Sequence, residues 1–204
     1  MNYITDVLFW ISSGLLVPVV ILLIILFARA LVLIGTFFGQ YLSIRRTEAK
    51  LRGVLDANVS IQELYKVLPV KSNSLVVAYM RRVIDAGGDK ALSGRLLSDF
   101  EVAADKDLAV SKTLTKMGPT LGLMGTLIPM GPALVGLATG DIGSMAYNMQ
   151  VAFATTVIGL FSSAIGFITL QIKQRWYLQD LANLEYVSNV VIENSAKDET
   201  QFAS

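Results

Sequence analysis

Residues 117–138 read MGPTLGLMGTLIPMGPALVGLA, and residues 146–172 read AYNMQVAFATTVIGLFSSAIGFITLQI. Neither stretch contains Asp, Glu, Lys or Arg. About 20 apolar residues are enough for a helix to cross the hydrocarbon of a bilayer, so each stretch predicts one transmembrane helix. Because only residues 139–145 separate them, the two helices are expected to form a hairpin.

A third apolar stretch, residues 7–44, has Arg29 as its only charge. No Lys or Arg precedes it, whereas a cleaved signal peptide begins with a positively charged region. We therefore expect a retained transmembrane helix that starts near Trp10 and leaves the hydrocarbon near Arg29, whose side chain can reach the inner headgroups. A role of Arg29 in ion transfer is the alternative.

The distribution of Lys and Arg predicts the orientation in the membrane. Residues 1–9 and 139–145 contain none, residues 45–116 contain 13 of the 17, and Lys173 and Arg175 follow the third stretch. Since basic loops stay on the cytoplasmic side, the N-terminus and the hairpin loop are expected outside and the C-terminus inside. This pattern predicts a multi-pass protein of the cytoplasmic (inner or plasma) membrane.

The expected fold class is an all-α integral membrane protein with three transmembrane helices and long cytoplasmic helical extensions. Cytoplasmic helices are expected from Ser60 to Pro69, from Ser74 to the Gly87-Gly88 pair, and from about Ser93 onwards. Beyond the third transmembrane helix we expect an amphipathic helix and then a solvated tail at residues 194–204. The predicted segments are 1–44 (first transmembrane helix and its inner extension), 45–116 (cytoplasmic helical segment), 117–138 (second transmembrane helix), 139–145 (outer hairpin loop), 146–172 (third transmembrane helix) and 173–204 (cytoplasmic helix and tail).

The composition excludes several kinds of active site. The chain has no Cys and no His, which removes thiol and imidazole chemistry and the usual zinc ligands. A formal net charge of +1 gives no indication of nucleic-acid binding. The segment 45–116 is too small to be an enzyme domain by itself. We therefore expect no enzymatic activity, no catalytic residue, no cofactor and no metal. Contact with membrane lipid is expected from the three apolar stretches.

Small residues and prolines recur in the second and third stretches at alternating steps of three and four, which places them along one stripe of each helix. Two interpretations stay open. The stripes can serve only close helix packing, or they can line a central cavity around a guest helix, where carbonyls freed by prolines are tolerated. The second stretch contributes Gly118, Gly122, Gly125, Pro129, Pro132, Gly136 and Gly140, and the third contributes Ala152, Thr155, Gly159, Ser162, Gly166 and Thr169, flanked by Thr156 and Ser163.

Two short motifs carry a family resemblance. Residues 122–126 (GLMGT) and 154–160 (ATTVIGL) resemble the paired signatures of the MotA/TolQ/ExbB proton channel family, which has G-L-x-G-T in one span and A-T-x-x-G-L in the next. The predicted layout is also similar, because one span, a basic inner helical segment and a hairpin of two spans follow in that order.

This resemblance implies a function and a partner. Family members form a pentamer around a dimer of a single-span protein of the ExbD, TolR or MotB kind, whose aspartate takes up and releases the proton. The chain would then be the channel-forming stator subunit of an ion-driven, proton-coupled motor that powers transport or envelope processes. Thr126 and Thr156 match the channel-lining threonines, and Thr155 is their neighbour. The residues expected to pack helices or face the partner are Gly122, Gly125, Pro129, Pro132, Ala152, Gly159, Ser162 and Ser163.

The sequence also departs from the family pattern. ExbB and TolQ members usually carry a glutamate about a turn and a half before the motif threonine, where this chain has Gln150 and Val151. The outer proton entrance is then built differently, or the coupling ion is not a proton. Together with Pro129 and Pro132, this indicates a divergent ExbB/TolQ-like branch. The alternative function is a structural or assembly membrane protein whose small-residue faces only pack, without ion conduction.

Overall fold

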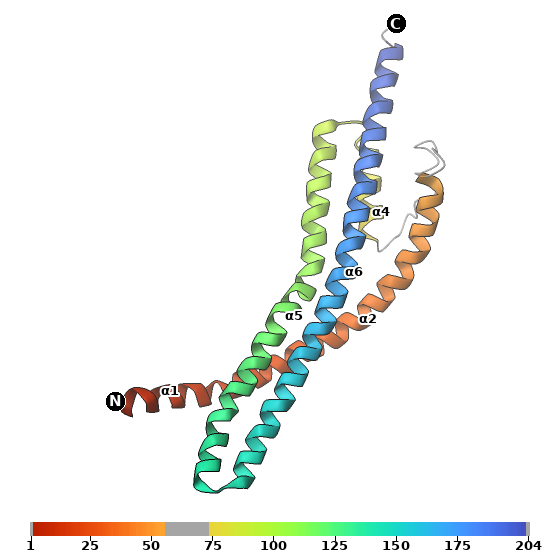
Figure 1. Cartoon of the computed structure of the whole chain (residues 1–204). Coiled ribbons are helices and arrows are strands. Elements are labelled where there is room, and N and C mark those ends of the chain that lie inside the picture. Colours follow the sequence, from red (N-terminus) through yellow and green to blue (C-terminus); the bar gives the residue numbers. More distant parts are fainter. Residues whose placement is uncertain (1, 56–73, 203–204) are drawn as a thin grey trace. The chain divides into compact units, whose positions relative to one another are not determined.

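The computed structural model describes residues 2–55 and 74–202, and every element in these ranges is an α-helix (Figure 1). Three helical stretches are long and apolar enough to cross a membrane, Val7–Tyr41, Lys90–Thr139 and Ile142–Ala196, as the sequence predicted. The expected helix from Ser60 to Pro69 lies outside the described residues. The helices are α1 (Asn2–Gly14), α2 (Leu16–Leu55), α4 (Leu75–Asp85), α5 (Lys90–Thr139) and α6 (Ile142–Phe202).

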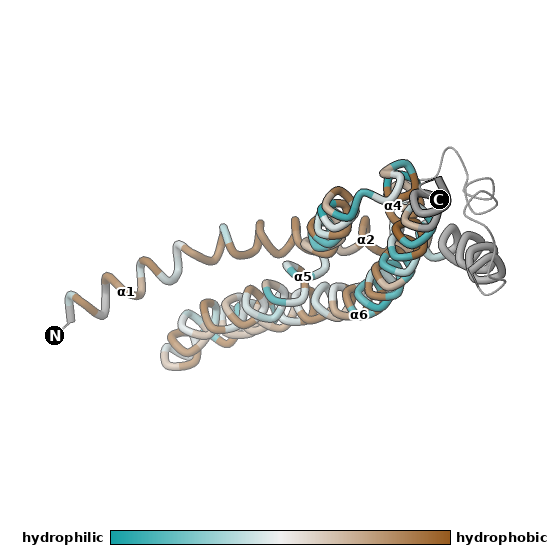
Figure 2. Tube along the Cα trace, turned by 90° about the horizontal axis from the view of Figure 1, so that it is seen from above, coloured by the Kyte–Doolittle hydropathy of each residue, from teal (hydrophilic) through white to brown (hydrophobic). Residues whose placement is uncertain are grey.

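The chain divides into two compact units. The membrane unit comprises Met1–Phe37 and Val110–Leu170, and the second unit comprises Phe38–Ala109 and Gln171–Ser204. Both α5 and α6 run without interruption from one unit into the other. Hydrophobic residues dominate α1 and the part of α2 that follows it, whereas hydrophilic and hydrophobic residues alternate on α4 (Figure 2).

A one-residue break separates α1 from α2 in the membrane unit. The helical hydrogen bonds from Leu15 N to Ile11 O and from Val19 N to Leu15 O are both present at 3.1 Å. Pro18, however, has no N–H to donate to the carbonyl of Gly14, and its ring crowds that carbonyl. The single helix predicted here is therefore interrupted at Leu15, where Pro18 acts on the preceding turn.

One face of α2 packs against the membrane hairpin of α5 and α6. Its buried residues are spaced by four and three positions, the pattern of a helix with one buried stripe. Arg29 lies outside this stripe and is exposed. The stripe consists of Val19, Leu23, Leu26, Ala30 and Leu33, and it forms one apolar cluster with Leu114, Leu121 and Ile165.

The hairpin turn between α5 and α6 is tighter than the predicted loop 139–145. Gly140 adopts φ +78°, a left-handed conformation that glycine reaches without strain. The carboxylate of Asp141 then accepts the N–H of Ser144 at 3.0 Å and caps the start of α6. As a result, α5 ends at Thr139 and α6 begins at Ile142.

The second unit has its own apolar core. The predicted helix from Ser74 to the glycine pair is confirmed as α4, which ends before Gly87 and Gly88 at φ +60° and +93°. Phe100 of α5 makes edge-to-face contact with Tyr79 of α4, with ring centroids 5.5 Å apart. The amphipathic continuation of α6 is also confirmed. The buried cluster contains Val76, Val77, Met80, Val83, Phe100, Leu184, Val187 and Val191.

Two helix ends differ from the prediction. α5 begins at Lys90 rather than near Ser93, because the carboxylate of Asp89 accepts the N–H groups of Ala91 and Leu92 at 2.9 and 3.0 Å. Residues 194–202, predicted as a solvated tail, are the last turns of α6. Within them Ser195 donates its hydroxyl to the carbonyl of Gly87 at 2.9 Å, which ties the end of α6 to the turn after α4.

Candidate ion-pathway site

The small-residue stripes of α5 and α6 face each other inside the hairpin, which Figure 1 shows as two long helices side by side. A Cβ atom added to Gly159 would lie 2.6 Å from the carbonyl oxygen of Gly118 and 2.9 Å from the Cα of Gly122. A Cβ atom added to Gly125 would lie 2.6 Å from the hydroxyl of Thr155. Glycine is therefore required at Gly159 for the two backbones to approach this closely, and at Gly125 to leave room for the side chain of Thr155.

The eight predicted packing residues differ in how deeply they are buried. Gly122, Gly125, Pro129, Ala152, Gly159 and Ser162 are buried, whereas Pro132 and Ser163 are half-buried.

The three candidate pathway threonines are brought together but differ in exposure. Thr155 is only 5% exposed and is enclosed between the helices. Thr126 and Thr156 are half-buried. Because Gly125 lies against Thr155 and Gly122 against Thr156, the two threonines are within about one helical turn of each other along the hairpin. Thr126 and Thr156 are therefore the two whose side chains keep access to the outside of the hairpin.

These two threonines lie away from the face that α2 covers. Thr126 follows Leu121 by five residues, which is roughly 140° around a helix, and Thr156 precedes Ile165 by nine, roughly 180°. Leu121 and Ile165 belong to the cluster with α2. The flank that carries Thr126 and Thr156 is therefore free of α1 and α2 and is available to another chain.

Each threonine hydroxyl donates to a backbone carbonyl of its own helix. Thr126 Oγ1 lies 2.7 Å from the carbonyl oxygen of Leu123. Thr156 Oγ1 lies 3.1 Å from that of Ala152 and also 3.5 Å from that of Gly122 on α5. Thr155 Oγ1 likewise lies 3.0 Å from Val151 O and 2.9 Å from Ala152 O. A carbonyl can only accept a hydrogen bond, so each hydroxyl already donates its hydrogen to a backbone carbonyl.

Prolines leave carbonyls of α5 without their helical donors. Pro119, Pro129 and Pro132 all lie within α5, and none has an N–H for the carbonyl four residues earlier. For Pro119 the freed carbonyl is that of Thr115, which accepts the hydroxyl of Ser163 from α6 at 3.1 Å. This bond was not predicted, since only the pairing of the two helices reveals it.

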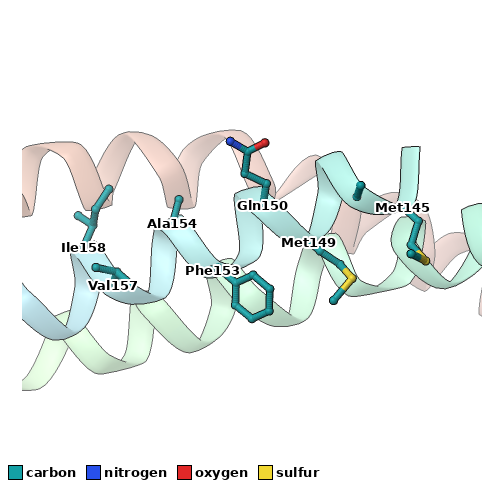
Figure 3. Close-up of a pocket in the computed structure, with 8 residues that line it drawn as sticks. Met145, Met149, Gln150, Phe153, Ala154, Val157 and Ile158 are labelled. Carbon is teal, nitrogen blue, oxygen red and sulfur yellow. The ribbon is translucent and has the colours of Figure 1, made fainter. Parts of the chain in front are cut away.

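An open groove runs along α6, with a volume of about 790 Å³ (Figure 3). Gln150 and Phe153 point to different sides of the helix in this view. Met149 and Phe153, which line the groove, precede Thr156 by seven and three residues and so lie roughly 20° and 60° from it around the helix. The groove therefore adjoins the face of α6 that carries Thr156. Its lining is apolar apart from Gln150 and consists of Met145, Ala146, Met149, Gln150, Phe153, Ala154, Val157 and Ile158.

A charged cluster in the second unit was not predicted. The ammonium of Lys173, whose side chain is 4% exposed, lies 2.8 Å from the carboxylate of Asp107, and the hydroxyl of Tyr177 donates to the same oxygen at 2.7 Å. Burial raises the pKa of Tyr177 well above its usual value, and the hydrogen bond to Asp107 and its negative charge raise it further. The spacing of Lys173 and Tyr177 places them on one helix face, but their partner is far away in sequence.

A comparison of the sequence with models of known protein families identifies the family of this chain. The model of the MotA/TolQ/ExbB proton channel family matches residues 75–185, which is more than half of the chain. The chain belongs to the MotA/TolQ/ExbB proton channel family. A search of curated proteins found no match.

The family match covers the features described above. It begins at the first residue of α4, includes all of α5 and ends within α6. Both motif segments, the threonine flank and the cluster of Asp107, Lys173 and Tyr177 therefore lie inside it. As a MotA/TolQ/ExbB family member with three apolar helices, the chain is a membrane protein of proton-channel type.

Proposed function

We propose that this chain is the channel-forming stator subunit of a proton-driven membrane motor. In this proposal five copies surround a dimer of a single-span protein of the ExbD, TolR or MotB kind in the cytoplasmic membrane. The N-terminus and the hairpin turn lie outside and the C-terminus inside. The chain performs no enzymatic reaction; it converts the ion gradient into rotation or mechanical work for transport or envelope processes.

The proposal rests on one observation. Thr126 and Thr156 are half-buried, and helical periodicity places both on the flank of the hairpin that α2 leaves open, at a depth where neither helix has a charged residue. Between Lys116 and Lys173 the sequence holds a single charge, Asp141 at the turn. A proton path through a membrane needs a group that can titrate, so the carboxylate must come from a partner that faces these threonines.

The structural alternative also has a specific observation behind it. The glycine stripes are used for contact between α5 and α6 of one chain, as the approach of Gly118 to Gly159 demonstrates. Close packing therefore explains the glycines without any channel. The hydroxyls of Thr126 and Thr156 also bond to backbone carbonyls, as packing residues would. The two functions therefore differ in what removing these hydroxyls does to ion uptake.

Reconstitution with the partner separates the two functions. The chain is co-expressed with the single-span protein encoded by the neighbouring gene, and proton uptake is measured in vesicles together with the mass of the purified complex. We expect five copies of this chain per two of the partner, and uptake that Thr126→Val or Thr156→Val abolishes while assembly persists. If a sodium gradient drives uptake and a proton gradient does not, the coupling ion is sodium.

The control substitution is Thr120→Val. Thr120 is also on α5 and also donates to a backbone carbonyl, that of Lys116 at 3.0 Å, but it is exposed and is not part of the flank. It should leave uptake unchanged. If both flank variants also conduct normally, the threonines serve packing and the structural alternative holds.

A further inference from the structure

The large apolar residues of α1 form one broad face that no helix of the membrane unit covers. Each residue of an α-helix is turned roughly 100° from the one before it, and this step places these residues within one half of the helix. All of them are exposed, Tyr3 at 88% and Trp10 at 78%. The outward face consists of Tyr3, Ile4, Val7, Leu8, Trp10 and Ile11.

The opposite face of α1 is more polar, yet it is the face turned towards the protein. Phe9 lies at its centre and contacts α5, because a Cβ atom added to Gly131 would lie 3.7 Å from the Phe9 ring. Ser12 and Ser13, on either side of Phe9 around the helix, are half-buried. A helix on a water-soluble protein packs its apolar face inward. The reversed arrangement of α1 therefore fits apolar surroundings.

The contact with α5 indicates how deep α1 lies in the membrane. Gly131 precedes the end of α5 at Thr139 by eight residues, which is about 12 Å along the helix. The charge of Asp141 keeps the hairpin turn out of the hydrocarbon. Phe9 therefore lies at most about 12 Å below the turn, near the depth of about 5–10 Å at which interfacial helices bury their apolar faces.

Two further features are typical of a helix at the membrane surface. Tyr3 and Trp10 are two helical turns apart and share one edge of the outward face, and Tyr and Trp are enriched where hydrocarbon meets headgroups. The break at Leu15 separates α1 from α2. The start of α1 also lies away from the hairpin in both views (Figure 1, Figure 2). α1 is therefore not a straight continuation of α2.

We propose that α1 is an interfacial helix that lies along the membrane surface on the side of the hairpin turn and binds phospholipid through the outward face. Helices in a membrane associate mainly through small residues, whereas the six members of the outward face are large and uncharged, which favours lipid over a second copy. The membrane-spanning part of the first apolar stretch then begins with α2, and residues 16–44 are enough to cross. Because Phe9 holds α1 against α5, the lipid bound by α1 sets how deeply the hairpin lies in the bilayer.

Spin labels test this proposal on the full chain in phospholipid vesicles. The chain has no Cys, so one introduced cysteine carries the only label. Ile4→Cys, Leu8→Cys and Ile11→Cys place the label on the outward face, and Ser12→Cys and Ser13→Cys are the matched controls on the opposite face. Collisions of the label with oxygen, which dissolves in hydrocarbon, and with a water-soluble nickel complex are measured by electron paramagnetic resonance, and their ratio gives the depth.

We expect the three outward labels to collide more often with oxygen than with the nickel complex, and the two control labels to collide less often with oxygen than the outward ones. The depth should change between positions 4 and 11 by less than half of the roughly 10 Å that an upright helix would give over seven residues.

Three other outcomes would overturn the proposal. A depth change near the full value would make α1 part of the spanning helix. More collisions with the nickel complex than with oxygen on the outward face would place this face in water. Shielding of the outward labels from both reagents would mean that protein covers the face, and spin coupling that disappears on dilution with unlabelled chain would identify that protein as a second copy.

Discussion

At the residue scale, Ser163 of α6 replaces a hydrogen bond that α5 cannot make for itself. Pro119 leaves the carbonyl of Thr115 without its helical donor, and the hydroxyl of Ser163 occupies that place at 3.1 Å. A polar bond between helices in a membrane typically contributes about 1 kcal/mol. The pair therefore ties the two helices together at the point where the proline weakens one of them.

This pairing predicts a dependence of one substitution on the other. Ser163→Ala should lower the free energy of unfolding by about 1 kcal/mol, measured by SDS-induced unfolding of the purified chain. In a Pro119→Ala background the loss should be close to zero, because the new N–H of residue 119 satisfies Thr115. Equal losses in both backgrounds would contradict the pairing.

The Gly118–Gly159 contact makes a second prediction. Gly159→Ala places a methyl group 2.6 Å from a carbonyl oxygen of the facing helix, and backbone cannot move aside without separating the helices. We expect a loss of about 2 kcal/mol in the same unfolding assay. Gly131→Ala is the matched control, since its methyl group would lie 3.7 Å from the ring of Phe9 and fits without strain. A loss of equal size for both substitutions would show that the cost comes from the helix backbone and not from the interface.

The sequence predicted the stripes but not their contacts. The spacing of Gly122 and Gly159 identifies one face of each helix, since helical periodicity depends only on the local sequence. The bond from Ser163 to Thr115 depends on the register of the hairpin, which the tight turn at Gly140 and Asp141 sets. Register is a property of the folded pair, so no local pattern contains it.

At the scale of the elements, α5 and α6 stay paired beyond the apolar stretches. In the second unit Asp107 accepts hydrogen bonds from Lys173 and Tyr177 with one carboxylate oxygen. The ammonium of Lys173 is buried, and a buried charge without a partner is strongly unfavourable. The cluster therefore holds the two helices together where glycine packing has ended.

We predict that Asp107→Ala lowers the free energy of unfolding by about 2 kcal/mol, because it leaves Lys173 buried and unpaired. Asp107→Ala combined with Lys173→Met should recover most of that loss, since replacing both partners removes the uncompensated charge. The exposed pair of Arg95 and Asp99, 3.9 Å apart on α5, is the control. Arg95→Ala should change stability by less than about 0.5 kcal/mol. A double variant no more stable than Asp107→Ala alone would contradict the account.

The helix ends show where local signals compete. The glycine pair at 87 and 88 identified the end of α4 correctly, since left-handed conformations favour glycine. The start of α5 was placed near Ser93, but Asp89 caps the helix and Ser93 is buried inside it. Both residue types are good caps, and the sequence alone does not rank them. Pro18 was a visible signal whose effect at Leu15 was not predicted.

At the scale of the whole molecule, the part of α5 and α6 that carries the three threonines has no charged side chain beside them. The hydroxyls of Thr126, Thr155 and Thr156 can accept a hydrogen bond but do not titrate in the range of a membrane gradient. The one charge between Lys116 and Lys173 is Asp141 at the hairpin turn. The family is one of proton channels, and in the function proposed above the titrating carboxylate belongs to the single-span partner.

The final prediction follows from placing the titrating carboxylate on the partner. Vesicles that contain this chain alone should show no sustained proton uptake when a pH gradient or a membrane potential is applied, because no residue at the level of the threonines can bind and release a proton. A protonophore added at the end verifies that the vesicles are sealed and the dye responds. Adding the single-span partner should restore uptake, and a partner whose membrane Asp is replaced by Asn should not. Robust flux through the chain alone would mean that water crosses the flank of Thr126 and Thr156 unaided, and the partner would then gate a path that this chain already contains.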